Sequence, residues 1–199
     1  MSNQLSNSIA SPIASSVALR SLRIGGIVLG GSLLLAVCAH LAIPLWFTPV
    51  PLTVQPFAVL LLGLLLSPRM AFATLAAYLA EGALGLPVFA PSPAISGFAH
   101  LFGPTGGYLV AYPFAAWLIS FLRLRVRPNF IQGLAVAAAG DFLILLCGAL
   151  WLAALSHLSL QSALSLGMLP FLPGDALKVA AAAGCAAGLR RFHRRRTNP

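Results

Sequence analysis

The sequence predicts an all-α integral membrane protein: a bundle of about six transmembrane helices with both termini cytoplasmic. Of its 199 residues, 59% are hydrophobic and only 8% are charged, whereas about a quarter of the residues of a soluble domain are charged. Apolar segments recur at lengths that suit membrane-crossing helices, and the arginines fall only in alternate connections between them. We therefore expect lipid to surround most of the chain.

Six apolar segments define the expected helices, because about 20 residues cross roughly 30 Å of hydrocarbon and a backbone in lipid must satisfy its own hydrogen bonds. The first ends in the turn-rich sequence PLWFTPVP, and the second stops at Ser67-Pro68. A segment rich in Pro, Gly and Ser follows the third, and we expect it to pack against the bundle. An amphiphilic link precedes the sixth. The expected helices are residues 24–45, 53–66, 69–84, 106–122, 130–155 and 173–189.

These helices form one membrane domain, residues 23–190, with no sign of a second domain or of an internal repeat. Residues 1–22 are rich in Ser and Asn and lack the basic start of a signal peptide, so we expect a mobile N-terminal tail. Residues 191–199 form a basic cytoplasmic tail.

The arginines predict the orientation, because cytoplasmic loops accumulate Lys and Arg. With six crossings, all eleven arginines lie on one side, and the three opposite links contain neither Arg nor Lys. An odd number of crossings would scatter these charges over both faces. The chain is therefore expected to be a multi-pass protein of the cytoplasmic membrane.

Asp175 and Lys178 are the strongest candidates for a binding site. A charge near the middle of a bilayer costs about 2.5–3.5 kcal/mol on insertion scales, so such residues usually face a cavity or the protein interior. The two residues are three apart at the start of the sixth helix and therefore share a face. Lys178, the only lysine, lies at the external end, away from all the arginines. A self-neutralising ion pair remains the alternative interpretation.

The other two carboxylates have less certain roles. Glu81, near the external end of the third helix, could face the same cavity or reach the membrane surface. Asp141, in the middle of the fifth helix, could serve as a proton relay or as a hydrogen-bonded structural residue. His40 and His100 have no second histidine at ligand spacing, which favours roles in the core or at the interface.

Small residues on the first helix form a smooth strip that permits close helix approach: Gly26, Gly30, Ser32 and Ala36. The strip could receive another membrane subunit or pack within the chain's own bundle.

Several function classes lack support in the sequence. The basic residues occur in short runs between apolar segments and not along one polar face, so no nucleic-acid partner is expected. The three cysteines stand alone, so no metal site is predicted. The chain has no phosphate-binding loop for ATP and no paired intramembrane aspartates of a protease.

Six sequence blocks occur in order along the chain: IPLWFTPVPLTVQ (43–55), LLSPR (65–69), GALGLPVFA (82–90), LFGPTGGYLVAYP (101–113), GALWLA (148–153) and FLPGDALK (171–178). Together they resemble the BioY family, the biotin-specific S components of energy-coupling factor (ECF) vitamin transporters. Family members often carry a Gly-rich loop after LPVF, where this chain has APSPAISG (90–97).

The resemblance implies a six-helix S-component fold that binds biotin near the outer face. It also implies partners, namely a transmembrane coupling subunit and two ATPase subunits. The family motif PGDxxK assigns biotin binding to Asp175 and Lys178, and the other blocks suggest Gln55, Tyr108 and Phe89 as pocket residues. Glu81 joins these candidates through its possible position on the cavity.

The sequence therefore predicts a substrate-capture subunit that binds biotin and mediates its uptake without covalent chemistry. No cofactor is expected, since biotin is the transported substrate, and the other contacts are with membrane lipid. Two alternatives remain. One is a solitary biotin carrier that works without ATPases and uses Asp141 or Glu81 as a proton relay. The other is an intramembrane enzyme.

Overall fold

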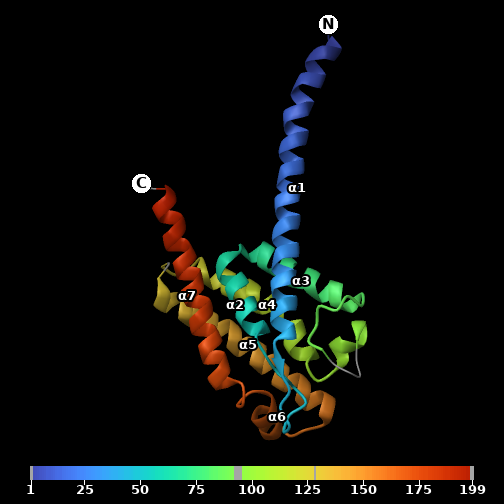
Figure 1. Cartoon of the computed structure of the whole chain (residues 1–199), viewed down its shortest axis with the longest axis vertical. Helices are drawn as coiled ribbons and strands as arrows, with labels where there is room; N and C mark the ends of the chain where they lie inside the picture. Colours follow the sequence, from blue (N-terminus) through green and yellow to red (C-terminus); the bar gives the residue numbers. More distant parts are fainter. Residues whose placement is uncertain (1, 92–95, 128, 198–199) are drawn as a thin grey trace.

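The computed structural model describes residues 2–91, 96–127 and 129–197, which fold into a mainly helical bundle (Figure 1). The loop sequence APSPAISG lies partly outside these residues, as do the first residue and the last two. In chain order the elements are α1 (Ser2–His40), β1 (Ala42–Ile43), β2 (Leu52–Thr53), α2 (Gln55–Leu65), α3 (Pro68–Ala83), the 3-10 helix η1 (Gly97–Phe102), α4 (Gly106–Arg123), α5 (Phe130–Ser156), α6 (Leu160–Gly167) and α7 (Leu172–Thr197).

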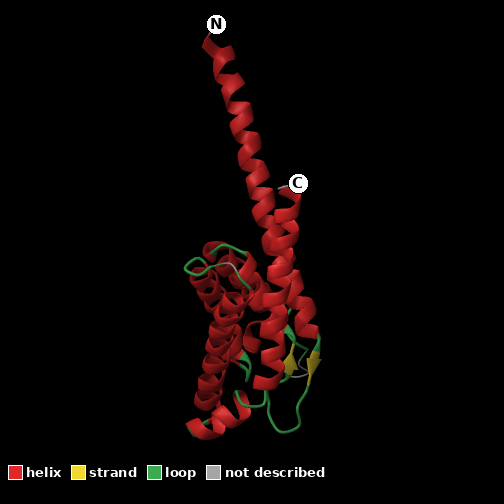
Figure 2. Cartoon of the chain, turned by 90° about the vertical axis from the view of Figure 1, so that its left-hand side faces the viewer, coloured by secondary structure: helices red, strands yellow, loops and turns green. Residues whose placement is uncertain are grey.

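The first helix differs from its prediction at both ends. Its N-terminal part projects beyond the bundle, so the segment expected to be a tail continues α1 as helix from Ser2 (Figure 2). At the other end α1 stops at His40, five residues before the predicted boundary. Ile43 precedes Pro44 and is therefore biased toward extended backbone. It pairs with Leu52 in a short antiparallel ladder of β1 and β2.

Helices α2, α4 and α5 approach one another closely through glycines. A Cβ on Gly63 of α2 would lie 2.9 Å from the Cβ of Ile119 on α4, and one on Gly140 of α5 would lie 2.3 Å from the same side chain. Ile119 is fully buried between them. The absence of side chains at both glycines therefore sets the spacing of these three helices.

The chain bends sharply before its last helix. α5 ends at Ser156, and His157 adopts a left-handed conformation with φ of 51°. The short α6 follows and meets α7 at 54°. α7 runs eight residues beyond its predicted end, to Thr197. Arg and Leu favour helix, and neither Gly nor Pro interrupts residues 189–197.

Helix length supports a membrane protein but leaves the number of crossings as a prediction. Among the described helices, Leu19–His40 and Phe130–Ser156 are each long and apolar enough to cross a membrane. The bent pair of α6 and α7 would make a third span. By contrast, the eleven residues of α2 extend only about 16 Å.

The two ends of the bundle differ in composition. Both termini and the α2–α3 and α4–α5 connections lie at one end, here called the arginine end, which holds Arg69, Arg123 and Arg190 (Figure 1). The β1–β2 hairpin and α6 lie at the opposite end, here called the cavity end. The side of the membrane on which each end lies stays a prediction.

Candidate binding site

A partly open cavity with a volume of about 40 Å³ lies at the cavity end. Its wall combines apolar side chains from several elements, including Leu109 of α4 and Ile144 of α5, with a few polar groups. Such a lining is typical of small-molecule sites. The lining residues whose side chains can form hydrogen bonds are Thr53, Gln55, His100, Thr105, Tyr108, Tyr112, Asp175 and Lys178.

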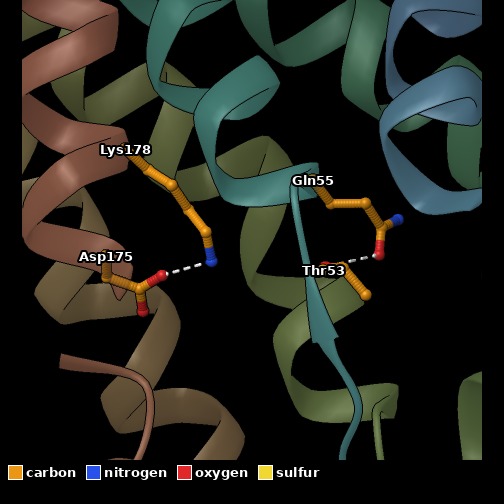
Figure 3. Close-up of polar contacts among 4 residues, drawn as sticks. All are labelled: Thr53, Gln55, Asp175 and Lys178. Atoms are coloured by element: carbon orange, nitrogen blue, oxygen red, sulfur yellow. Dashed lines mark hydrogen bonds and ion pairs between the residues drawn. The ribbon is translucent and has the colours of Figure 1, made fainter. Parts of the chain in front are cut away.

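Asp175 and Lys178 form a buried ion pair on the cavity wall. The Lys178 Nζ donates to Asp175 Oδ1 at 2.6 Å, and the two side chains are 13% and 3% exposed, respectively. Asp175 lies in the first turn of α7, where a negative charge is favoured by the helix dipole. Figure 3 shows both side chains extending from α7 toward the turn between β2 and α2. The pair thus offers a ligand one cationic donor and one anionic acceptor side by side.

Gln55 is held at the cavity by a chain of hydrogen bonds. Its Nε2 donates to the hydroxyl of Tyr78 at 2.7 Å, and that hydroxyl donates to the carbonyl of Val88 at 2.8 Å. The Thr53 hydroxyl donates to Gln55 Oε1 at 3.4 Å (Figure 3). Sequence reasoning identified Gln55 but missed Tyr78 and Thr53. A tyrosine inside an apolar helix carried no motif that could reveal its partner.

Tyr108 lines the cavity with its ring. Its hydroxyl donates to the carbonyl of Gly167, which ties α4 to the end of α6. The ring lies edge-on to Phe171 at 6.4 Å between centroids. A Cβ on Gly148 would lie 2.1 Å from the Tyr108 ring, so this glycine provides the room that the ring occupies. Since the hydroxyl proton already has an acceptor, Tyr108 presents mainly an apolar surface to a ligand.

Phe89 and Glu81 do not line the cavity, in contrast to the sequence-based expectation. Phe89 is buried behind the wall, with ring centroids 5.5 Å from Tyr78 and 5.1 Å from His100. Glu81 accepts a hydrogen bond from the Ser32 hydroxyl and thereby links α3 to α1. Phe89 therefore supports the wall, and Glu81 joins two helices outside the cavity.

The small residues of the strip on α1 face two different surroundings. Ser32 and Ala36 are buried in the chain's own bundle, at 2% and 8% exposure. Gly26 and Gly30 are exposed, and a Cβ added to either would meet no described atom within 4 Å. Only the glycine pair is therefore available on the outer surface.

These features describe a helical membrane protein with a mainly apolar cavity whose wall carries an ion pair. Comparison with known proteins identifies the family. The chain belongs to the BioY family, whose family model matches residues 11–195.

Individual relatives agree over most of the chain. The sequence is 42% identical over 135 residues to the "Probable biotin transporter BioY" of Pyrococcus horikoshii, which covers 67% of this chain and 76% of the relative. It is 36% identical over 159 residues to the "Biotin transporter BioY" of Thermotoga maritima, with coverages of 80% and 90%. A crystal structure of the S-component for biotin from an ECF-type ABC transporter matches the fold with a TM-score of 0.78 and 28% identity, over 86% of this chain and 93% of that one.

Proposed function

We propose that this chain is the S component of an ECF-type ABC transporter, the subunit that captures biotin for uptake across the cytoplasmic membrane. The relatives are named as biotin transporters, and the matching crystal structure is that of a biotin S-component. The observation that carries the proposal is the Lys178–Asp175 ion pair on the wall of a mainly apolar cavity. No residue is assigned a covalent step.

The geometry of the pair favours the ureido ring of biotin as the end that it meets. The carboxylate and the ureido ring lie at opposite ends of biotin, whereas Nζ and Oδ1 lie 2.6 Å apart, so a single end contacts both residues. A ureido ring has N–H donors for Asp175 and a carbonyl acceptor for Lys178. The biotin carboxylate would satisfy Lys178 but would place a second negative charge beside buried Asp175. We therefore assign the ureido ring to the pair.

Other wall residues complete the binding site in this proposal. The Gln55 amide is held in place by Tyr78 and supplies a further polar contact. The rings of Tyr108 and Phe171 supply apolar surface. Binding then draws on desolvated polar contacts together with apolar enclosure.

The proposed topology has six crossings, by α1 to α5 and α7, with both termini in the cytoplasm. It is supported by the location of both termini at the arginine end, because basic residues accumulate on the cytoplasmic side (Figure 1). The proposed partners are a transmembrane coupling subunit and two ATPase subunits. Gly26 and Gly30 provide an open surface on α1 against which a helix of the coupling subunit can pack.

Biotin binding to the purified protein tests the central proposal. Isothermal titration should show saturable binding by the wild type and at least a 100-fold weaker affinity for Lys178→Ala and Asp175→Ala, as expected when a buried charge loses its partner. Biotinamide, which lacks the carboxylate charge, should still bind because the ureido ring is intact. A wild-type protein that does not bind biotin would refute the function, and two variants that bind like wild type would refute the site.

Uptake into proteoliposomes tests the partners separately. With the coupling and ATPase subunits present, biotin uptake should require ATP. Equal uptake without those subunits would favour the solitary carrier.

A further inference from the structure

Asp141 is a buried carboxylate that the proposed contacts with biotin leave unused. It is 6% exposed within α5, and its Oδ1 has no hydrogen-bond partner among the described residues. A buried polar atom without a partner is unfavourable and calls for an explanation. Glu81 provides a contrast, because it accepts a hydrogen bond from Ser32. One oxygen of Asp141 is therefore available for a further hydrogen bond.

The location of Asp141 relates it to the binding site. Ile144 and Leu145, which line the cavity, lie three and four residues further along α5 and so share its face. Asp141 is thus one turn beyond the cavity wall, toward the arginine end. α5 packs against α7, the helix that carries Asp175 and Lys178.

The hydrogen-bonding capacity of Lys178 suggests what Asp141 does. An ammonium has three N–H donors, and Asp175 accepts from one of them. When ureido N–H groups engage Asp175, that carboxylate has less capacity for Lys178. A buried ammonium that loses its counter-charge is strongly unfavourable. A second buried carboxylate next to the cavity wall would keep it paired.

We propose that Asp141 is a positioning residue of the biotin site that acts through Lys178. In the empty protein Lys178 pairs with Asp175. When the ureido ring binds, the ammonium turns partly toward the free oxygen of Asp141, while Asp175 accepts from the ring. This inference rests on the proposed function, because it requires biotin to bind at the pair.

The single lysine of the chain allows a direct test by NMR. Protein labelled with ¹⁵N at lysine Nζ gives one side-chain ammonium signal, which is that of Lys178. Asp141→Asn, which retains the shape but removes the charge, should leave this signal in place in the empty protein and shift it in the biotin-bound protein. It should also weaken biotin binding on the order of tenfold, whereas Asp141→Glu should restore part of the affinity.

Glu81→Gln is the matched control, because it neutralises a carboxylate outside the cavity; it should change neither the affinity nor the lysine signal. If Asp141→Asn gives no folded protein, Asp141→Ser carries the same comparison. Wild-type binding together with an unchanged affinity and bound-state signal in the variant would overturn the inference but leave the proposed function intact. Equal shifts in the empty and bound states would also overturn it, since Asp141 would then act on the resting pair.

Discussion

The cavity end and the arginine end both bury polar groups, but they bond them to different partners. At the cavity end, the ion pair and the amide bond other side chains, since Lys178 donates to Asp175 and Gln55 donates to Tyr78. The tyrosine hydroxyls beside them donate to backbone carbonyls. At the arginine end, side chains bond the backbone at the end of α2. Arg190 donates to the carbonyl of Leu64 at 2.6 Å, while Ser120 and Arg123 donate to that of Leu66 at 2.6 and 3.3 Å, respectively.

The difference separates exchangeable polar groups from structural ones. The last carbonyls of a helix have no partner within the helix and carry the negative end of its dipole, so the arginines at the end of α2 complete its hydrogen bonding. A ligand that displaced them would leave those carbonyls unsatisfied. At the cavity end a ligand with its own donors and acceptor can replace a side-chain bond without exposing the backbone. The comparison predicts that changes at the cavity end affect binding most.

The largest effect is expected when the charge pair is broken on one side. Asp175→Asn removes the carboxylate that pairs with Lys178 in the described structure, and Lys178→Met leaves the Asp175 carboxylate without its counter-charge. Each should destabilise the protein by about 3–5 kcal/mol because an uncompensated charge remains buried. The double variant has neither charge and should recover most of the thermal stability in detergent, while biotin binding stays lost.

This comparison distinguishes a loss of binding from a loss of folding. The double variant is the folded reference for the single ones, because its cavity lacks the charges but keeps similar volumes. If the double variant unfolded at the same temperature as the single variants, an unpaired buried charge would not explain their instability. If it bound biotin like wild type, the pair would not be the polar core of the site.

Sequence patterns predicted those parts of the fold that follow from apolar length and local chain chemistry. The boundaries of α2 to α5 lie within two residues of the prediction, since Pro56, Pro68 and the left-handed His157 fix their ends. The end of α1 was missed because residues 41–45 are mostly apolar, although Pro44 biases Ile43 toward extended backbone, and pairing with β2 then holds Ala42 and Ile43 in a ladder. A contact between two separate segments leaves no periodic pattern in the sequence from which it could be predicted.

The features of the candidate site likewise divide into those that the sequence predicted and those that it did not. The pairing of Asp175 and Lys178 follows from their spacing of three residues, and the structure places both on the cavity. By contrast, the location of Glu81 depends on which residue of α1 faces it, and Ser32 occupies that position. The support of Gln55 by Tyr78 likewise spans 23 residues. Interactions within one helical turn were predictable, whereas those between helices were not.

A smaller effect is expected when the cavity wall is shifted without any change in charge. The Cβ of Gly148→Ala would lie 2.1 Å from the Tyr108 ring, so the ring must move. Overpacking of this kind costs about 1–3 kcal/mol. We expect biotin affinity to fall on the order of tenfold in titration. Gly133→Ala on the same helix is the control, because its Cβ would meet Ala183 at an ordinary 3.9 Å. Equal affinities for both variants would show that the position of the Tyr108 ring does not matter.

The smallest effect is expected at Arg190. This residue tests the structural role assigned to the polar groups of the arginine end. Its guanidinium donates to the carbonyl of Leu64 in the last turn of α2. Arg190→Gln should lower thermal stability by about 1 kcal/mol, since a charged hydrogen bond to a partly buried carbonyl is lost. Arg191→Gln, at an exposed neighbouring position, should leave stability nearly unchanged. Neither variant should alter biotin affinity, because the cavity lies at the opposite end of α2. A weaker affinity for Arg190→Gln alone would mean that the two ends are coupled through α2. The arginine end would then have a role in binding as well as in completing the helix.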